Sequence, residues 1–161
     1  MMKAKSGFTL VEILIVVVIL GILAAIVIPQ FTEASSEAKL SSMVTDLQSV
    51  RSQIELYKIQ HNDNLPGVAN GTHLATADFV ASLTGKTNIF GVAVPITTTT
   101  DCYGPYLQKI PTNQFVNSDV VGIGALGGVA PPVSTDGSQG WYFDTDTGRF
   151  WATSDADHLN Y

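Results

Sequence analysis

An apolar run of membrane length lies near the start of this sequence, and a single carboxylate lies inside it. The run extends from Phe8 to Ile28, and from Ile13 onward it contains no polar side chain. A helix of this length measures roughly 31 Å at about 1.5 Å per residue, which is the thickness of a bilayer's hydrocarbon core. Glu12 would cost roughly 2.5 to 3.5 kcal/mol at the bilayer centre, so it needs a partner and a function.

Positive charge lies on only one side of this run. Lys3 and Lys5 precede it, and the next basic residue is Lys39. This asymmetry predicts a single-pass segment with a cytoplasmic N-terminus and with the rest of the chain outside. A secretory signal peptide fits poorly, because its apolar region has only about 7 to 15 residues and an Ala-x-Ala-like site follows it. A plain signal anchor explains the length and the charges but leaves Glu12 unexplained.

Composition narrows the class of protein further. The 161 residues carry a formal charge of −6, and the acidic excess is scattered along the chain. A nucleic-acid partner would require a basic patch, so none is expected. Cys102 is the sole cysteine, which excludes an intramolecular disulfide.

Residues 5–12 read Lys-Ser-Gly-Phe-Thr-Leu-Val-Glu. With the apolar run that follows, they resemble the processing site of the type IV pilin and type II secretion pseudopilin superfamily. The resemblance implies that a prepilin peptidase removes a leader, residues 1–7, by cutting between Gly7 and Phe8, and that it methylates the new N-terminus at Phe8. It also implies a bacterial inner-membrane subunit that an assembly platform in that membrane builds into a helical homo-oligomeric filament, periplasmic or extracellular.

Glu12 has a physical role in this interpretation, and Thr9 belongs to the same assembly segment. Cleavage creates an amine on Phe8, four residues before Glu12. A buried charge without a partner is expensive, whereas a paired one is tolerated. The resemblance implies that the amine of one subunit meets Glu12 of its neighbour and sets the register of assembly. Pairing within one chain is the alternative.

A flexible section of the helix is predicted from Gly21 to Pro29, where the transmembrane segment, residues 8–28, ends. Pro29 removes one helical hydrogen bond and crowds the carbonyl of Ala25, so a kink is expected there. Gly21 weakens the same stretch. Gly21 and Pro29 bracket a segment that resembles the one which loses helicity in assembled pili.

Beyond Pro29, apolar residues still recur at helical spacing, but polar residues now separate them. This pattern predicts an amphipathic helix over residues 29–61. Its apolar side chains are spaced alternately by three and four residues. They are Leu40, Met43, Leu47, Val50, Ile54 and Tyr57. This stripe predicts packing into the chain's own C-terminal domain, with a coiled coil as the alternative. The turn residues 62–67 predict the end of the helix.

Residues 62–161 predict a globular head of an α+β fold, in which a small antiparallel sheet packs on the long helix, as in pilins. A short helix is expected over 76–83, and strands are expected over 92–97 and 119–123. The β-rich runs 141–144 and 149–153 predict a hairpin. Its aromatic side chains are candidates for the core: Trp141, Phe143, Phe150 and Trp151. This hairpin also resembles one found in pseudopilins, whereas the Gly, Pro and Ser-rich stretch 113–139 departs from compact members of the superfamily.

No enzymatic site is predicted. Residues 122–127 match G-x-G-x-x-G, but a dinucleotide site needs a helix to begin there, and Gly-Val-Ala-Pro-Pro follows instead. The histidines show no zinc-site spacing. No cofactor is therefore expected, with one candidate exception.

That exception is calcium near the C-terminus. Major pseudopilins are similar in carrying a calcium site in their C-terminal loops, and carboxylates are ligands that calcium prefers. The candidate ligands are Asp144, Asp146, Asp155 and Asp157. A solvated acidic surface is the alternative.

We therefore expect a non-enzymatic structural subunit of a type IV pilus-like or type II secretion pseudopilus filament. A monomeric, membrane-anchored binding or adhesion module outside the cytoplasm is the alternative from another class. Glu12 distinguishes them, because a simple anchor does not need this carboxylate. A secreted enzyme with an uncleaved anchor is a third possibility, but it lacks a convergent set of titratable groups.

Overall fold

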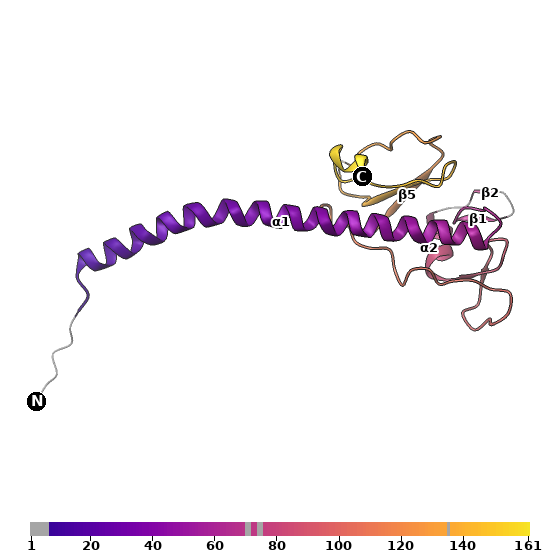
Figure 1. Cartoon of the computed structure of the whole chain (residues 1–161), viewed down its shortest axis with the longest axis horizontal. Helices are drawn as coiled ribbons and strands as arrows, with labels where there is room; N and C mark the ends of the chain where they lie inside the picture. The colour runs from indigo at the N-terminus through magenta and orange to yellow at the C-terminus, as the bar shows by residue number, and fades with distance from the viewer. Residues whose placement is uncertain (1–6, 70–71, 74–75, 135) are drawn as a thin grey trace, which may run out of the picture. The chain divides into compact units, whose positions relative to one another are not determined.

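A computed structural model describes the chain apart from residues 1–6, 70–71, 74–75 and 135. The chain divides into two compact units, residues 1–40 and residues 41–161 (Figure 1). The second unit contains every strand, and each unit is considered by itself below.

The helix α1 extends from Leu10 to Gln60, and Pro29 lies inside it. The structure therefore confirms the long N-terminal helix of the predicted α+β fold. The helix ends in a turn in which Asn62 and Asp63 adopt the left-handed conformation, with φ of 53° and 62°. Asp63 donates its backbone N–H to the carbonyl of Lys58 at 2.9 Å, which satisfies one of the last helical carbonyls.

The last third of α1 buries one face in the second unit. The side chains that are no more than 1% exposed recur every three or four residues, and they are Met43, Leu47, Val50, Ile54 and Tyr57. This is the predicted stripe, and Leu40 at its start is half-buried. The helix therefore packs against its own head domain, as the spacing predicts.

The described residues of the head form three small sheets and two further helical segments. β1 (Val68–Ala69) pairs with β2 (Thr72–His73), and β3 (Lys86–Thr87) pairs with β4 (Ala93–Val94), both antiparallel. The third sheet has the order β5 (Val121–Gly124), β6 (Trp141–Asp144) and β7 (Phe150–Ala152). α2 covers Thr76–Thr84, and the 3-10 helix η1 covers Asp157–Asn160.

The predicted hairpin is present in the third sheet. β6 and β7 are antiparallel, with Trp141 opposite Ala152, and Gly148 in their connecting turn has a φ of 74°. The pairing of β5 with β6 is parallel, however, which the alternation of side chains does not predict. A parallel pair needs a long crossover, and residues 125–140 supply it by returning the chain to the same end of the sheet.

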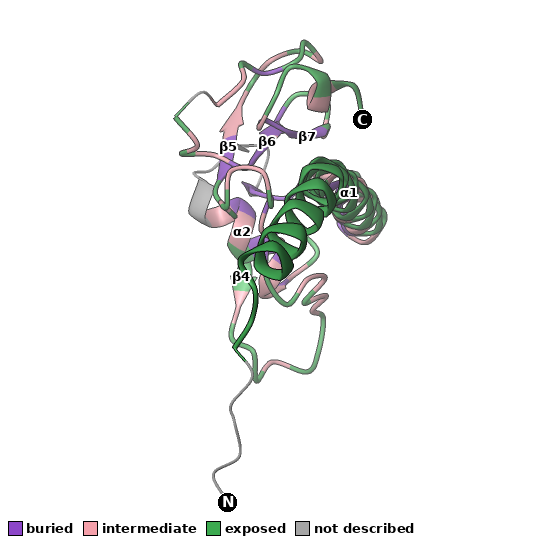
Figure 2. Ribbon diagram, turned by 90° about the vertical axis from the view of Figure 1, so that its left-hand side faces the viewer, coloured by how far each residue is buried: buried purple, intermediate pink, exposed green. Residues whose placement is uncertain are grey.

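The core of the head is aromatic. The rings of Phe79 on α2 and Phe143 on β6 lie 4.4 Å apart between centroids, and those of Trp141 and Phe150 lie 5.5 Å apart. Figure 2 shows the buried residues gathered where α2 and β5–β7 face the end of α1. Trp141 donates its indole N–H to the carbonyl of Pro111 at 2.7 Å, so the buried ring leaves no polar atom unpaired. The predicted hairpin core is thus confirmed.

Two of the predicted elements are shorter or shifted. The run 92–97 forms only the two residues of β4, because Pro95 has no N–H to donate to a sheet. The strand expected over 119–123 begins two residues later, at Val121. The short helix expected over 76–83 is confirmed as α2.

Candidate functional site

The junction between Gly7 and Phe8 lies outside regular structure, just before α1. Phe8 is 84% exposed, and a Cβ added to Gly7 would have no atom of the described residues within 4 Å. The backbone φ angle of Gly7 is also not in the positive range that favours glycine. The fold of the chain itself therefore gives no reason for glycine at this position, so its side-chain-free backbone is open to another protein. Residues 1–6 of the predicted leader lie outside the described residues.

Thr9 and Glu12 form a reciprocal cap on the N-terminus of α1. Thr9 donates its backbone N–H and its hydroxyl to Glu12 Oε2, at 2.8 and 2.9 Å. The backbone N–H of Glu12 returns a bond to Thr9 Oγ1 at 3.2 Å. This is a capping box, whose Thr-x-x-Glu spacing is readable in the sequence and adds a local role for both residues. Glu12 Oε1 accepts no hydrogen bond from the residues that the structure describes.

The first half of α1 presents apolar side chains on all sides. Between Leu10 and Ile28 every large apolar side chain is at least half exposed, from 51% at Ile19 to 81% at Leu10. A helix that is apolar all round is stable only inside a membrane or a larger core. By length and composition, α1 is the one helix among the described residues that could cross a membrane.

Gly21 and Pro29 both lie within the continuous α1. A Cβ at Gly21 would meet nothing within 4 Å, and its φ is not positive, so no local contact requires glycine there. Glycine in a helix interior costs about 1 kcal/mol relative to alanine. The flexibility predicted between these residues concerns the assembled state, and it stays a prediction.

Asp144 is an acidic residue of the head whose carboxylate accepts four hydrogen bonds. Its buried carboxylate accepts hydrogen bonds from the backbone N–H groups of Leu126, Gly128 and Asp146 at 2.7 to 3.0 Å, and from the Thr147 hydroxyl at 2.6 Å. Burial would raise the pKa of this carboxyl group, but these four bonds outweigh it and lower the pKa to about 2. Asp144 thereby ties the glycine-rich loop to the β6–β7 turn.

The other candidate calcium ligands are arranged separately. Asp146 accepts the N–H of Gly127 at 3.2 Å, and Asp155 accepts the N–H of Asp157 at 3.2 Å. Within the described part of the chain, no group of three or more His, Cys, Asp or Glu side chains could hold a metal ion. Both oxygens of Asp144 already accept protein donors. The residues in this arrangement do not fit a calcium site, and the calcium prediction gains no support from it.

The other patterns considered in the sequence have structural roles. β5 is followed by a turn, and between residues 125 and 140 no described residue is helical, so no helix N-terminus is available at 122–127 for a dinucleotide. His61 is fully buried and donates from Nδ1 to the carbonyl of Tyr57, while the Thr87 hydroxyl bonds Nε2, each at 2.8 Å. Burial lowers the pKa of His61.

Arg51 was not foreseen as an important residue. Its guanidinium donates from Nε and Nη2 to the carbonyl of Phe150 at 3.0 and 2.7 Å, and from Nη2 to the carbonyl of Tyr161 at 2.6 Å. Burial and the nearby Arg149 lower its pKa. Arg51 thus clamps α1 to β7 and to the C-terminal segment, a contact across 99 positions for which no local sequence signal exists.

Comparison with known proteins adds evidence on the N-terminal segment. Residues 2–28 match a family model described as "Prokaryotic N-terminal methylation motif". Over 59 residues the chain is 42% identical to the type II secretion system core protein G of Pseudomonas aeruginosa, covering 37% of this chain and 42% of that protein. The chain spans less than half the length of the first curated relatives that it matches.

Other relatives match over different lengths. The chain is 32% identical over 108 residues to the prepilin peptidase-dependent protein D of Escherichia coli, covering 60% of this chain and 74% of that protein. It is also 43% identical over 54 residues to a fimbrial protein of Pseudomonas aeruginosa, covering 34% and 35% of the two chains. No solved structure is significantly similar.

Proposed function

This chain belongs to the type IV pilin and pseudopilin superfamily, and on that premise we propose that it is a structural subunit of a type IV pilus-like or type II secretion pseudopilus filament. The observation that carries the proposal is the first half of α1, whose apolar side chains are all exposed and whose first turn holds Glu12. Such a surface requires a membrane before assembly and other helices after it.

Processing by a prepilin peptidase comes first. The peptidase cuts between Gly7 and Phe8 and methylates the amine of Phe8, removing the leader 1–7. The exposure of this junction and the absence of any structural need for glycine support that role. Lys3 and Lys5 place the leader on the cytoplasmic face of the bacterial inner membrane, and residues 8–28 span it.

Assembly then pairs charges between subunits. The new amine of one subunit binds Glu12 of its neighbour, and Oε1 supports this role because Thr9 engages only Oε2. Pairing Phe8 with a position four residues further along implies that parallel neighbours are offset by about 6 Å, at 1.5 Å per residue. The apolar helices cover one another in the filament core, while residues 29–61 carry the heads, 62–161, on the outside. The inner-membrane assembly platform drives this transfer out of the membrane.

A substitution at Glu12 tests assembly against the alternative of a monomeric anchored module. In the native host, Glu12→Leu should abolish sheared filaments while the subunit remains in the membrane fraction, because the neighbour's amine loses its buried partner. Val11→Leu is the matched control, since it leaves the charge unchanged and should assemble normally. Normal filament assembly by Glu12→Leu would contradict the pairing of charges between subunits. A wild-type protein that forms no filaments would contradict the filament function and favour the monomeric module.

The mass of the mature chain tests processing. Intact-mass and N-terminal analysis of the full protein from its native host should give a chain that begins at methylated Phe8. In a strain without prepilin peptidase the chain should begin at Met1. A chain that begins at Met1 in the native host, or one cut after Ile28, would contradict the assignment.

A further inference from the structure

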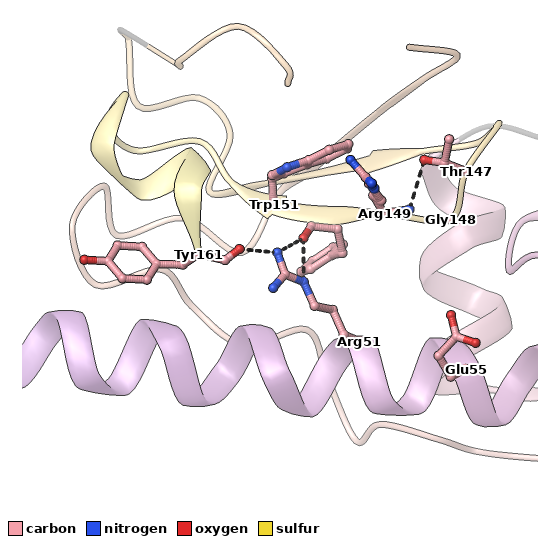
Figure 3. A pocket seen from close by; sticks show the side chains of 8 residues that line it. Arg51, Glu55, Thr147, Gly148, Arg149, Trp151 and Tyr161 are labelled. Carbon is pink, nitrogen blue, oxygen red and sulfur yellow. Dashed lines mark hydrogen bonds between the residues drawn. The ribbon is translucent and has the colours of Figure 1, made fainter. Parts of the chain in front are cut away.

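Both arginines of the sequence, Arg51 and Arg149, line one cleft of the head. The cleft has a volume of about 390 Å³ and lies between α1, the β6–β7 turn and the C-terminal segment. Figure 3 shows Arg51 reaching up from α1 and Arg149 lying beside Trp151. The two guanidinium groups are close enough that Arg149 lowers the pKa of Arg51. The chain thus gathers like charges that repel each other at this one place.

The two arginines differ in how far the head already uses them. Arg51 makes three hydrogen bonds to backbone carbonyls and is therefore part of the fold. Arg149 is exposed, and its side chain makes only one long bond to the described residues, from Nη1 to the carbonyl of Gly128 at 3.4 Å. One acid, Glu55, lines the same cleft, and its carboxylate lies 3.3 Å from the ammonium group of Lys58. Most of the five donors of Arg149 therefore remain available for an anion.

A matching pair of carboxylates lies on α1, just beyond the apolar run. Glu33 and Glu37 are both exposed and are four residues apart, so they share one face of the helix. Neither forms an ion pair or a hydrogen bond with the residues that the structure describes. Like charges at this spacing destabilise an isolated helix, and Lys39 lies on a different face. This acidic pair follows directly after the segment that brings neighbouring helices together.

We propose that the Arg149 side of the cleft receives the Glu33–Glu37 pair of a second copy of this chain, so that each neighbouring contact in the filament carries a head-to-helix ion pair. Charge complementarity supports this occupant. The full chain has a formal charge of −6 and loses two further positive charges with Lys3 and Lys5, so copies repel each other, and the contact places the two arginines against two acids. Arg149 binds a carboxylate through two hydrogen bonds, and the positive charge of Arg51 attracts the same acidic pair. The inference rests on the proposed filament function and adds a second contact to it.

Charge reversal in the full-length protein tests this pairing. Arg149→Glu and Glu37→Arg should each lower the yield of sheared filaments by about tenfold or more, because a weak contact repeats at every subunit. The double variant should restore the yield to within about twofold of the wild type, a recovery that a merely structural role would not give. Lys109→Glu is the matched control, since it changes the net charge equally at an exposed site outside the cleft.

Folding is checked separately. The thermal unfolding temperature of the detergent-solubilised full chain should be no lower for Arg149→Glu than for the wild type, since Arg149 is exposed and its loss removes a repulsion of Arg51. Wild-type filament yields in both single variants would overturn the inference, and so would losses that the double variant fails to restore. The wild type and Glu12→Leu are measured alongside: if the wild type forms no filaments, the filament function fails, and if Glu12→Leu alone blocks assembly, only the ion pair fails.

Cysteine crosslinking gives an independent result. In a Cys102→Ser background, Glu37→Cys combined with Arg149→Cys should give a ladder of disulfide-linked subunits in oxidised filaments. Glu37→Cys combined with Lys109→Cys should give none. Equal ladders in both pairs, or no ladder in filaments that contain the first pair, would overturn the inference.

Discussion

The two ends of α1 are parts of one helix, yet they solve the problem of apolar surface in opposite ways. Between Leu10 and Ile28 every large apolar side chain is at least half exposed. Near the other end, Leu47 and Val50 are completely buried by the head. The difference lies in the pattern, since the first stretch is apolar on all sides and the last third is apolar on one stripe. An all-round apolar helix must be completed by other molecules, whereas a stripe can be completed by its own chain.

The largest expected effect on stability distinguishes these two ends directly. Leu47→Ala should lower the free energy of unfolding of the head by about 2 to 5 kcal/mol, because it leaves a cavity under α1. Leu23→Ala removes the same atoms from an exposed position and should leave that free energy unchanged. Both are measured by denaturation of the detergent-solubilised full chain, followed by the fluorescence of the buried Trp141 and Trp151. Equal losses in the two variants would break the comparison.

A smaller effect is expected from Asp144, which stabilises the head without apolar contact. Its pKa in the folded state is about 2, below the usual value of 3.8. The carboxylate therefore contributes about 2 kcal/mol above pH 4, and this is lost as the pH falls from about 4 to 2. Asp144→Asn should remove that contribution at pH 7, so that the free energy of unfolding falls less steeply as the pH drops below about 4. Asp119→Asn, at an exposed site, is the control and should keep the wild-type profile.

The smallest expected effect concerns Gly21 in the exposed half of α1. Gly21→Ala should stabilise the local helix by about 0.5 to 1 kcal/mol, because the new Cβ meets no atom within 4 Å. Hydrogen exchange of residues 18–24 in detergent should slow by a matching factor, while the unfolding of the head stays unchanged. If filament yield falls despite the stronger helix, glycine is required by the assembled state. Unchanged exchange would argue against glycine as the weak point of the helix.

The sequence made the local features of the molecule predictable. The alternating spacing from Met43 to Tyr57 predicted the buried face of α1, and the aromatic runs around Trp141 and Phe150 predicted the β6–β7 hairpin and its core. Each signal is periodic, and the residues that form it lie within a short stretch of the chain. The Thr9–Glu12 capping box was equally local, and its Thr-x-x-Glu spacing could have indicated it.

Contacts between distant positions were not predictable. The parallel pairing of β5 with β6 depends on the path of the loop 125–140, which has no periodicity. The clamp formed by Arg51 joins residues 99 positions apart. Asp144 was a candidate ligand for calcium, with a solvated acidic surface as the alternative, and its oxygens accept four donors from its own chain. In each case the partner is set by three-dimensional packing, and the residue type alone fits several roles.

The two carboxylate oxygens of Glu12 have different contacts, and this difference has a consequence for the direction of a filament. Oε2 is held by Thr9 of the same chain, so one oxygen remains for a neighbour. If each carboxylate takes one amine from the next subunit, every internal subunit is matched on both sides. The two ends of the filament then differ chemically, because one displays an unmatched amine and the other an unmatched carboxylate. On the proposed filament function, growth is polar, because a new subunit meets a different chemical group at each end.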